Sequence, residues 1–165
     1  MRAMIFYLIK IVVPLFIAFT YSVGADLELD KIVSNANKMG KHTMLFLHKD
    51  GCRFCEKMIF DLEDKNLSKR IDKDFILVDI NRDDDETISF QGYTGTNRGF
   101  LKKLGVDFYP IVIFMDKNSS FIYSVAGYRN KKSFIRTLDY ISSEDYRKKT
   151  FEEFEDESLS HSKSE

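Results

Sequence analysis

The chain has 165 residues, a length typical of one domain, and its 44% hydrophobic residues, with 15 Phe and 8 Tyr, are enough to form a core. Its 25 basic and 26 acidic residues give a formal charge of −1, and no long run of Lys and Arg occurs. We therefore expect no nucleic-acid partner.

The first 25 residues have the layout of a secretory signal peptide. Arg2 gives a basic start, an apolar run covers residues 11–19, and the small residue Ala25 ends the segment. We expect cleavage after Ala25 and a periplasmic location. The alternative is an uncleaved membrane anchor, because residues 4–23 are nearly long enough to cross a bilayer.

The rest of the chain, from residue 26, predicts alternating helices and strands. Apolar residues on one face predict a helix at 30–39, and short apolar runs predict strands at 43–48 and 75–80. A second helix is expected between those strands, from about 52 to 70. The polar residues 81–97 predict a segment without regular structure.

Further elements are expected in the second half: a short helix at 100–104, strands at 111–115 and 121–125 around a turn at 116–119, a core helix at 131–141, and an amphipathic helix within 142–154. The acidic, Ser-rich residues 155–165 predict a disordered tail, so the domain should cover 26–154. Strands joined through a helix should be parallel, and those of a hairpin antiparallel. The pattern predicts a single α/β sheet with helices on both faces.

The two cysteines lie in the sequence Gly51-Cys52-Arg53-Phe54-Cys55, after the first buried strand and at the start of a helix. Unpaired N–H groups and the helix dipole stabilise an anion at such a place, so a thiol there has a lowered pKa and becomes a nucleophile. Cys52, nearest the helix end, should attack, and Cys55 should resolve the mixed disulfide. Arg53 adds a positive charge nearby.

Other roles for the cysteine pair remain open. A structural disulfide across so short a gap would remove little unfolded-state entropy. A zinc site would need two more ligands, and His42, His48 and His161 are the histidines available. Two inert core cysteines would conflict with Asp50-Gly51, which should expose this end of the helix. We expect neither a metal nor a cofactor.

The second signal is Tyr109-Pro110, directly before the strand at 111–115. Proline is tolerated as the first residue of a strand, so an ordinary turn is one interpretation. The other is a cis peptide bond that places backbone groups against a neighbouring site.

This order of elements and motifs resembles the thioredoxin superfamily over roughly residues 29–141. The resemblance implies a thioredoxin fold, which is a central mixed β-sheet flanked by helices, here with an extra N-terminal helix. It implies that Cys52 and Cys55 are the redox pair and that Tyr109-Pro110 is the substrate-binding cis-proline site. In finer detail, residues 51–58, 127–129 and 151–154 look like those of periplasmic SoxW-like thioredoxins.

Two departures from thioredoxin concern the chemistry. Its buried Asp, six residues before the first Cys, corresponds to Phe46, so Cys55 needs another proton acceptor. Glu56 and His48 are candidates by sequence distance. His48 could instead stabilise the Cys52 thiolate, or be an ordinary surface residue at a strand end. The dipeptide Arg53-Phe54 differs from that of well-known relatives and leaves the redox direction open.

We expect an exported thiol–disulfide oxidoreductase that reduces substrate disulfides with Cys52 as nucleophile and Cys55 as resolving thiol. Its partners should be protein thiols and disulfides and a membrane protein that donates electrons, and it should be a monomer. The alternatives are a disulfide oxidase of the same fold and a non-catalytic peptide-binding or chaperone module.

Overall fold

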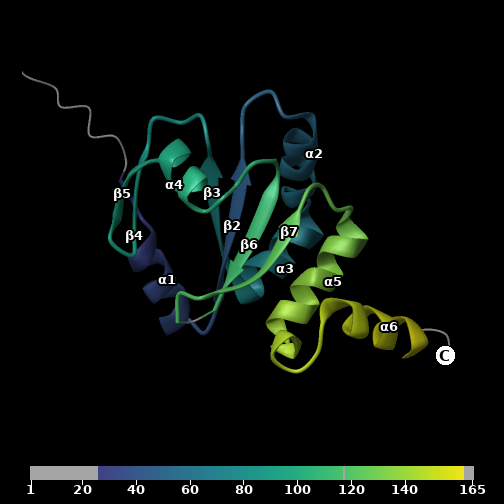
Figure 1. Ribbon diagram of the computed structural model, residues 1–165. Helices are drawn as coiled ribbons and strands as arrows, with labels where there is room; N and C mark the ends of the chain where they lie inside the picture. The colour runs from purple at the N-terminus through teal and green to yellow at the C-terminus, as the bar shows by residue number, and fades with distance from the viewer. Residues whose placement is uncertain (1–25, 117, 162–165) are drawn as a thin grey trace, which may run out of the picture.

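A four-stranded mixed sheet lies at the centre of the computed structural model, which describes residues 26–116 and 118–161 (Figure 1). Its strands, in spatial order, are β3 (Phe75–Asn81), β2 (His42–His48), β6 (Ile111–Met115) and β7 (Phe121–Ala126). β2 pairs in parallel with β3, whereas β6 is antiparallel to both β2 and β7. The expected central mixed sheet is confirmed.

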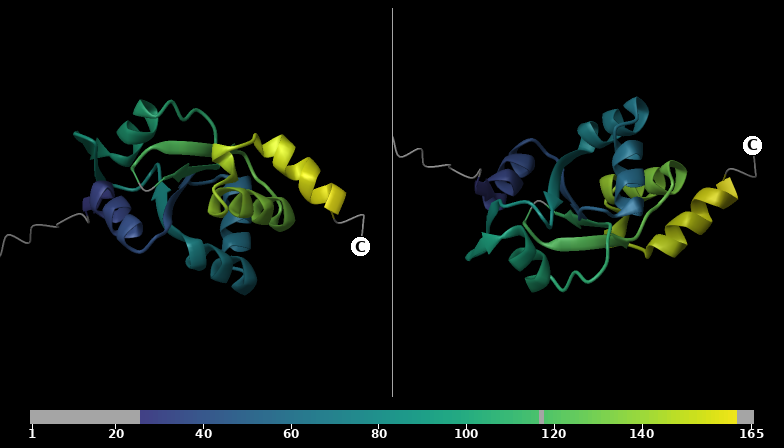
Figure 2. Two further views of the ribbon diagram at one scale, coloured as in Figure 1. Left: turned by 90° about the horizontal axis from the view of Figure 1, so that it is seen from below. Right: turned by 90° about the horizontal axis from the view of Figure 1, so that it is seen from above.

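Side chains of β2 alternate between two hydrophobic cores, because successive residues of a strand point to opposite faces. Met44 and Phe46 belong to one core, and Leu45 and Leu47 to the other. The helices that contribute to the first core are α2 (Arg53–Leu62), α3 (Lys65–Asp74) and α5 (Lys131–Ser142), and those of the second are α1 (Leu29–Lys38) and α4 (Asn97–Lys103). Helices therefore cover both faces of the sheet (Figure 2).

The expected single helix from 52 to 70 is two helices. α2 ends at Leu62, and α3 begins after Asp64, whose carboxylate accepts the N–H groups of Asn66 and Leu67 at 3.1 and 3.2 Å. A side-chain oxygen in that position satisfies the unpaired donors of a helix start. Asp64 therefore starts a new helix within the predicted one.

The segment expected to be irregular contains two strands of a second sheet. β4 (Thr87–Phe90) pairs in parallel with β1 (Asp26–Glu28) and antiparallel with β5 (Tyr93–Thr96). The prediction of a single sheet was therefore wrong. These strands have three or four residues, β1 is mostly acidic, and β4 and β5 carry Thr, Ser or Gly, so they lack the apolar run by which the central strands were found.

The C-terminal segment also differs from expectation. A short 3₁₀ helix at Asp145–Arg147 precedes α6 (Phe151–His161), so residues 155–161, expected to be disordered, are helical. Thr150 and Glu153 form a reciprocal capping box, in which each side chain accepts the other's backbone N–H. Phe151 and Phe154 pack against Tyr140 of α5, with ring centroids 5.4 and 5.3 Å away. Capping and aromatic packing together hold this helix on the domain.

Four chain segments meet at one end of the central sheet. β2 ends at His48, which pairs with Asn81 at the end of β3. β6 begins beside that end, and β7 finishes there, since Ile111 pairs with both Leu47 and Ala126. The Gly127 N–H donates to the carbonyl of Pro110 at 2.8 Å. The loops that carry the two predicted motifs are therefore neighbours.

Within residues 26–116 and 118–161, no helix is long and apolar enough to cross a membrane. The predicted signal peptide, residues 1–25, lies outside the described part of the chain.

Candidate active site

The cysteine pair lies at the start of α2, where the sequence placed it. Cys52 is the N-cap residue, and its Sγ accepts the backbone N–H of Cys55 at 3.2 Å. A disulfide joins the two residues, whose Cα atoms are 5.2 Å apart. Gly51, with φ +62°, makes the turn into the helix in a left-handed conformation that suits glycine. The Cys52 sulfur thus lies where helix N–H groups stabilise a negative charge.

The two cysteines differ in access to solvent. Cys55 is only 1% exposed on the inner face of α2, whereas Cys52 is partly exposed. An incoming disulfide can therefore reach Cys52 but not Cys55. The division into attacking and resolving thiols stays a prediction, which an attack on the more accessible sulfur would require.

The Tyr109–Pro110 peptide bond is cis, as the resemblance implied. Pro110 is buried beside the end of β2, and Tyr109 is partly exposed next to it. The Arg82 guanidinium and the Lys49 ammonium lie 5.7 and 6.0 Å from the centre of the Tyr109 ring. Burial raises the pKa of Tyr109 above its ordinary value, although the charge of Arg82 opposes the shift. The phenol is therefore neutral at physiological pH.

Phe54 and Tyr128 form an aromatic rim beside the cysteine pair. Phe54 is 59% exposed and stacks on Tyr128, with ring centroids 6.4 Å apart, and the Lys57 ammonium lies 4.4 Å from the Tyr128 ring. The Tyr128 hydroxyl donates a 2.7 Å hydrogen bond to Asp61, which raises the pKa of Tyr128. Arg53 and Glu56, two predicted supporting residues, are exposed on α2.

His48 is buried at the end of β2, so the surface interpretation of this residue was wrong. Its ring stacks on Phe46 at 5.0 Å. Its Nε2 lies 2.7 Å from a carboxylate oxygen of Asp79 on β3, an ion-pair distance, although the alignment is not that of a hydrogen bond. Sequence analysis assigned no role to Asp79.

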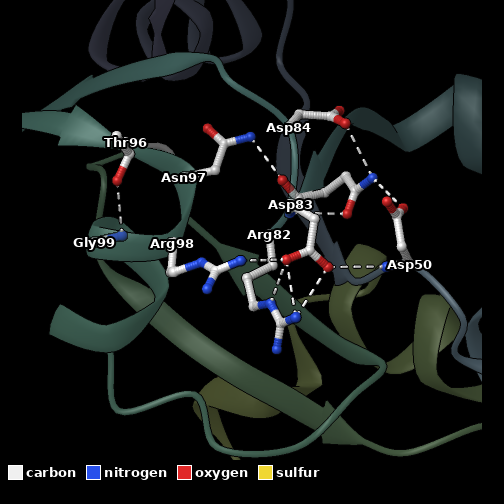
Figure 3. A network of polar contacts seen from close by, with 9 residues as sticks. Asp50, Arg82, Asp83, Asp84, Thr96, Asn97, Arg98 and Gly99 are labelled. Atoms are coloured by element: carbon white, nitrogen blue, oxygen red, sulfur yellow. Dashed lines mark hydrogen bonds and ion pairs between the residues drawn. The ribbon is translucent and has the colours of Figure 1, made fainter.

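A polar network ties the loop before Cys52 to the end of β3 (Figure 3). The backbone N–H of Asp50 donates to Asp83 at 3.2 Å, and the Asn81 side chain donates to the Asp50 carboxylate at 2.8 Å. Arg82 and Arg98 both donate to Asp83, at 2.9 and 2.7 Å. This network fixes the chain two residues before the nucleophile.

The same contacts set the charge of Asp83. Desolvation by itself would raise its pKa, but the Arg82 guanidinium, the Asp50 N–H and the Arg98 guanidinium together lower it below the ordinary value. Asp83 is therefore ionised at neutral pH. A carboxyl whose pKa is lower in the folded than in the unfolded protein stabilises the fold at any pH above its unfolded-state pKa. This stabilisation is lost as the pH falls through the folded-state pKa.

The thioredoxin-like domain family matches residues 29–142, which is most of the chain and includes both cysteines and the cis-proline. The chain belongs to the thioredoxin-like family. It is similar in structure to a thioredoxin-fold protein from Helicobacter pylori, with a TM-score of 0.60 and 22% identity over 72% of this chain and 80% of that one.

Two further thioredoxin-like structures show the same fold. A thioredoxin from Thermus thermophilus gives a TM-score of 0.54, with 18% identity over 70% of this chain and 85% of that one. The oxidised C-terminal domain of DsbD from Neisseria meningitidis gives 0.51, with 19% identity over 70% and 97% of the two chains. Comparison with curated protein sequences gives no significant match.

The residues described in this thioredoxin-like chain contain no group of three or more His, Cys, Asp or Glu side chains that could hold a metal ion. The histidines considered as zinc ligands belong to three different places in the fold. His42 begins β2 and His48 ends it, while His161 is the last residue of α6.

Asp83 is expected to hold the cysteine loop of this thioredoxin-like domain in place. Asp83→Ala removes the acceptor for the Asp50 N–H, so we expect amide hydrogen exchange at Asp50 to accelerate on the order of tenfold at neutral pH. Asp84→Ala is the matched control, because Asp84 is exposed and accepts only from Asn81 within the network. Equal exchange at Asp50 in the two variants would show that Asp83 does not hold this loop.

Proposed function

We propose that this chain is an exported thiol–disulfide oxidoreductase that reduces disulfides of protein substrates through Cys52 and Cys55. The observation that carries the proposal is the position of the Cys52 sulfur at the N-cap of α2, where it accepts the Cys55 N–H at 3.2 Å. A thiolate formed there is stabilised by the helix end and becomes the nucleophile of disulfide exchange.

The reaction has two exchange steps. The Cys52 thiolate attacks one sulfur of the substrate disulfide, forms a mixed disulfide and releases the other sulfur as a thiolate. Cys55 then attacks the Cys52 sulfur and releases the second substrate thiolate, which leaves the Cys52–Cys55 disulfide. The partial exposure of Cys52 and the burial of Cys55 support this order.

The substrate chain would lie between the cis-proline and the aromatic rim. Tyr109 and Pro110 directly precede β6, while Phe54 of α2 lies between the two cysteines in the sequence and stacks on Tyr128, which follows β7. The exposed Phe54 ring offers apolar contact beside Cys52, as is common where one protein binds another.

The reductive direction rests on the resemblance to SoxW-like thioredoxins. In that direction the oxidised protein must regain two electrons, and we propose a membrane protein as donor. Export rests on the signal-peptide layout of residues 1–25, and the exported protein would act as a monomer in the periplasm.

The reduction potential of the Cys52–Cys55 couple, measured against glutathione, tests the direction. We expect a value near thioredoxin's, about −270 mV, which suits an electron donor. A value near about −120 mV would instead indicate a disulfide oxidase. The catalytic claim itself is tested by turnover of a protein disulfide with excess reductant, since a pure binding module would bind partners without accelerating reduction.

A further inference from the structure

We infer that His48, paired with Asp79, accepts the proton of the Cys55 thiol when Cys55 resolves the mixed disulfide. The inference rests on the proposed function and assigns the proton transfer in its second step. Cys55 is 1% exposed, so direct transfer of its proton to bulk water is slow at neutral pH. The thiolate is nevertheless the form that attacks a disulfide, so a group inside the protein has to take the proton.

The direction of α2 relative to β2 places the two residues at the same end of one face of the sheet. Met44, Phe46 and His48 share one face of β2, because alternate residues of a strand point the same way. That face packs against the inner face of α2, since Phe46 shares a core with Met58. Cys55 lies three residues before Met58 and is buried on the same side of the helix.

The order along both elements then decides the pairing. The chain leaves β2 at His48, turns, and runs back along the sheet as α2 (Figure 1). The first buried residue of the helix and the last inward-facing residue of the strand therefore lie at the same end of this face. These residues are Cys55 and His48, whereas Met58 follows Cys55 toward Phe46.

The chemistry of the pair suits the task. Imidazole is the side chain that takes up and releases a proton near neutral pH. The imidazolium formed on His48 is stabilised by the Asp79 carboxylate, whose oxygen lies 2.7 Å from Nε2. Asp79 is 62% exposed on the edge strand β3, so a proton can leave the pair toward solvent.

The other titratable and charged groups at this end of the sheet have different partners or positions. Glu56, the second candidate acceptor, is exposed on the outer side of α2. Asp61 accepts the Tyr128 hydroxyl at 2.7 Å and lies 3.9 Å from Lys131. Lys49 lies 6.0 Å from the centre of the Tyr109 ring. The remaining groups near the cysteines belong to the network of Asp83 or to the exposed surface of α2: Asp50, Arg53, Lys57, Arg82, Asp84 and Arg98.

The step balances without a further reactant. Cys55 Sγ–H transfers its proton to His48, and the Cys55 thiolate attacks Cys52 Sγ. The Cys52–Cys55 bond forms as the bond between Cys52 and the substrate sulfur breaks, and the substrate leaves as a thiolate. His48 then returns its proton to that thiolate or to water. Two electrons have moved from the dithiol to the substrate disulfide.

The test separates the two exchange steps by stopped flow. Fully reduced protein in excess is mixed with dithiobis(nitrobenzoate), a chromogenic disulfide that releases one coloured thiolate when Cys52 attacks and a second when Cys55 attacks. For His48→Gln we expect the second phase to slow about a hundredfold at neutral pH and the first to stay within about twofold. The second phase should recover at alkaline pH, where hydroxide removes the Cys55 proton.

Two further variants complete the design. Asp79→Asn should also slow the second phase, by less than His48→Gln, and its exposed position makes it safe for folding. His42→Gln is the matched control, because His42 is a buried histidine on the same face at the other end of β2. It should change neither phase.

If the second phase is unchanged in both His48→Gln and Asp79→Asn, this inference is overturned and the proposed function is not. The same holds if both phases slow equally and do not recover at alkaline pH. A wild-type protein that releases neither thiolate would overturn the proposed function itself, which is a different result.

Discussion

Replacing Cys55 by serine is expected to convert the protein into a covalent trap for its substrates. Cys52 keeps its position at the N-cap of α2 and can still attack a disulfide, but no second thiol is left to release the product. Mixed disulfides on Cys52 should therefore accumulate. Turnover of a protein disulfide should fall by at least about a thousandfold, to the uncatalysed level, because no covalent route to release remains. Non-reducing electrophoresis of the full-length variant, residues 1–165, measures the adducts.

The control for this experiment is Cys52→Ser, which removes the nucleophile and keeps the buried thiol. The chain has two cysteines, so every adduct of a single variant has one possible site. We expect Cys52→Ser to form almost no adducts, because Cys55 is buried. If neither variant forms adducts while affinity capture still recovers partners, the chain is a binding module. Stronger trapping by Cys52→Ser would reverse the assigned roles.

Elements with local signals were predictable from the sequence. The apolar run of β2 and the amphipathic pattern of α5 each specify one element within a short window. The strands β4 and β5 carry no such run. They are stabilised by pairing with each other and with β1, which a short sequence window does not reveal. Helix α6 had a signal that was overlooked, because Thr150 and Glu153 have the spacing of a capping box.

The same distinction holds for the candidate site. Cys52, Cys55 and Pro110 were found because their motifs are contiguous in sequence and lie next to predicted strands. Asp79 and Asp83 were missed because parallel pairing of β2 with β3 brings Asp79 to His48 and Asp83 to the cysteine loop from about thirty residues away. The general rule that sites form at the carboxyl ends of parallel strands would have indicated the end of β3, although not which side chain acts there.

The largest loss of stability is expected from Phe114→Ala. Phe114 is 0% exposed in β6, between β2 and β7, and its ring lies 5.6 Å from Phe75 and 6.5 Å from Tyr123. Removing a buried phenyl ring leaves a cavity and costs about 3–5 kcal/mol of unfolding free energy. A domain of this size has about 5–15 kcal/mol in total, so the variant should be marginally folded.

Urea unfolding of the oxidised protein measures this loss, with Phe60→Ala as the matched control. Phe60 is the same residue type but is 72% exposed on α2, so its removal should change the unfolding free energy by no more than about 0.5 kcal/mol. β6 also begins directly after Pro110, so any repacking around residue 114 should reach the cis-proline edge of the site. Equal stability of the two variants would mean that the core does not depend on the close packing of β6, contrary to the arrangement described above.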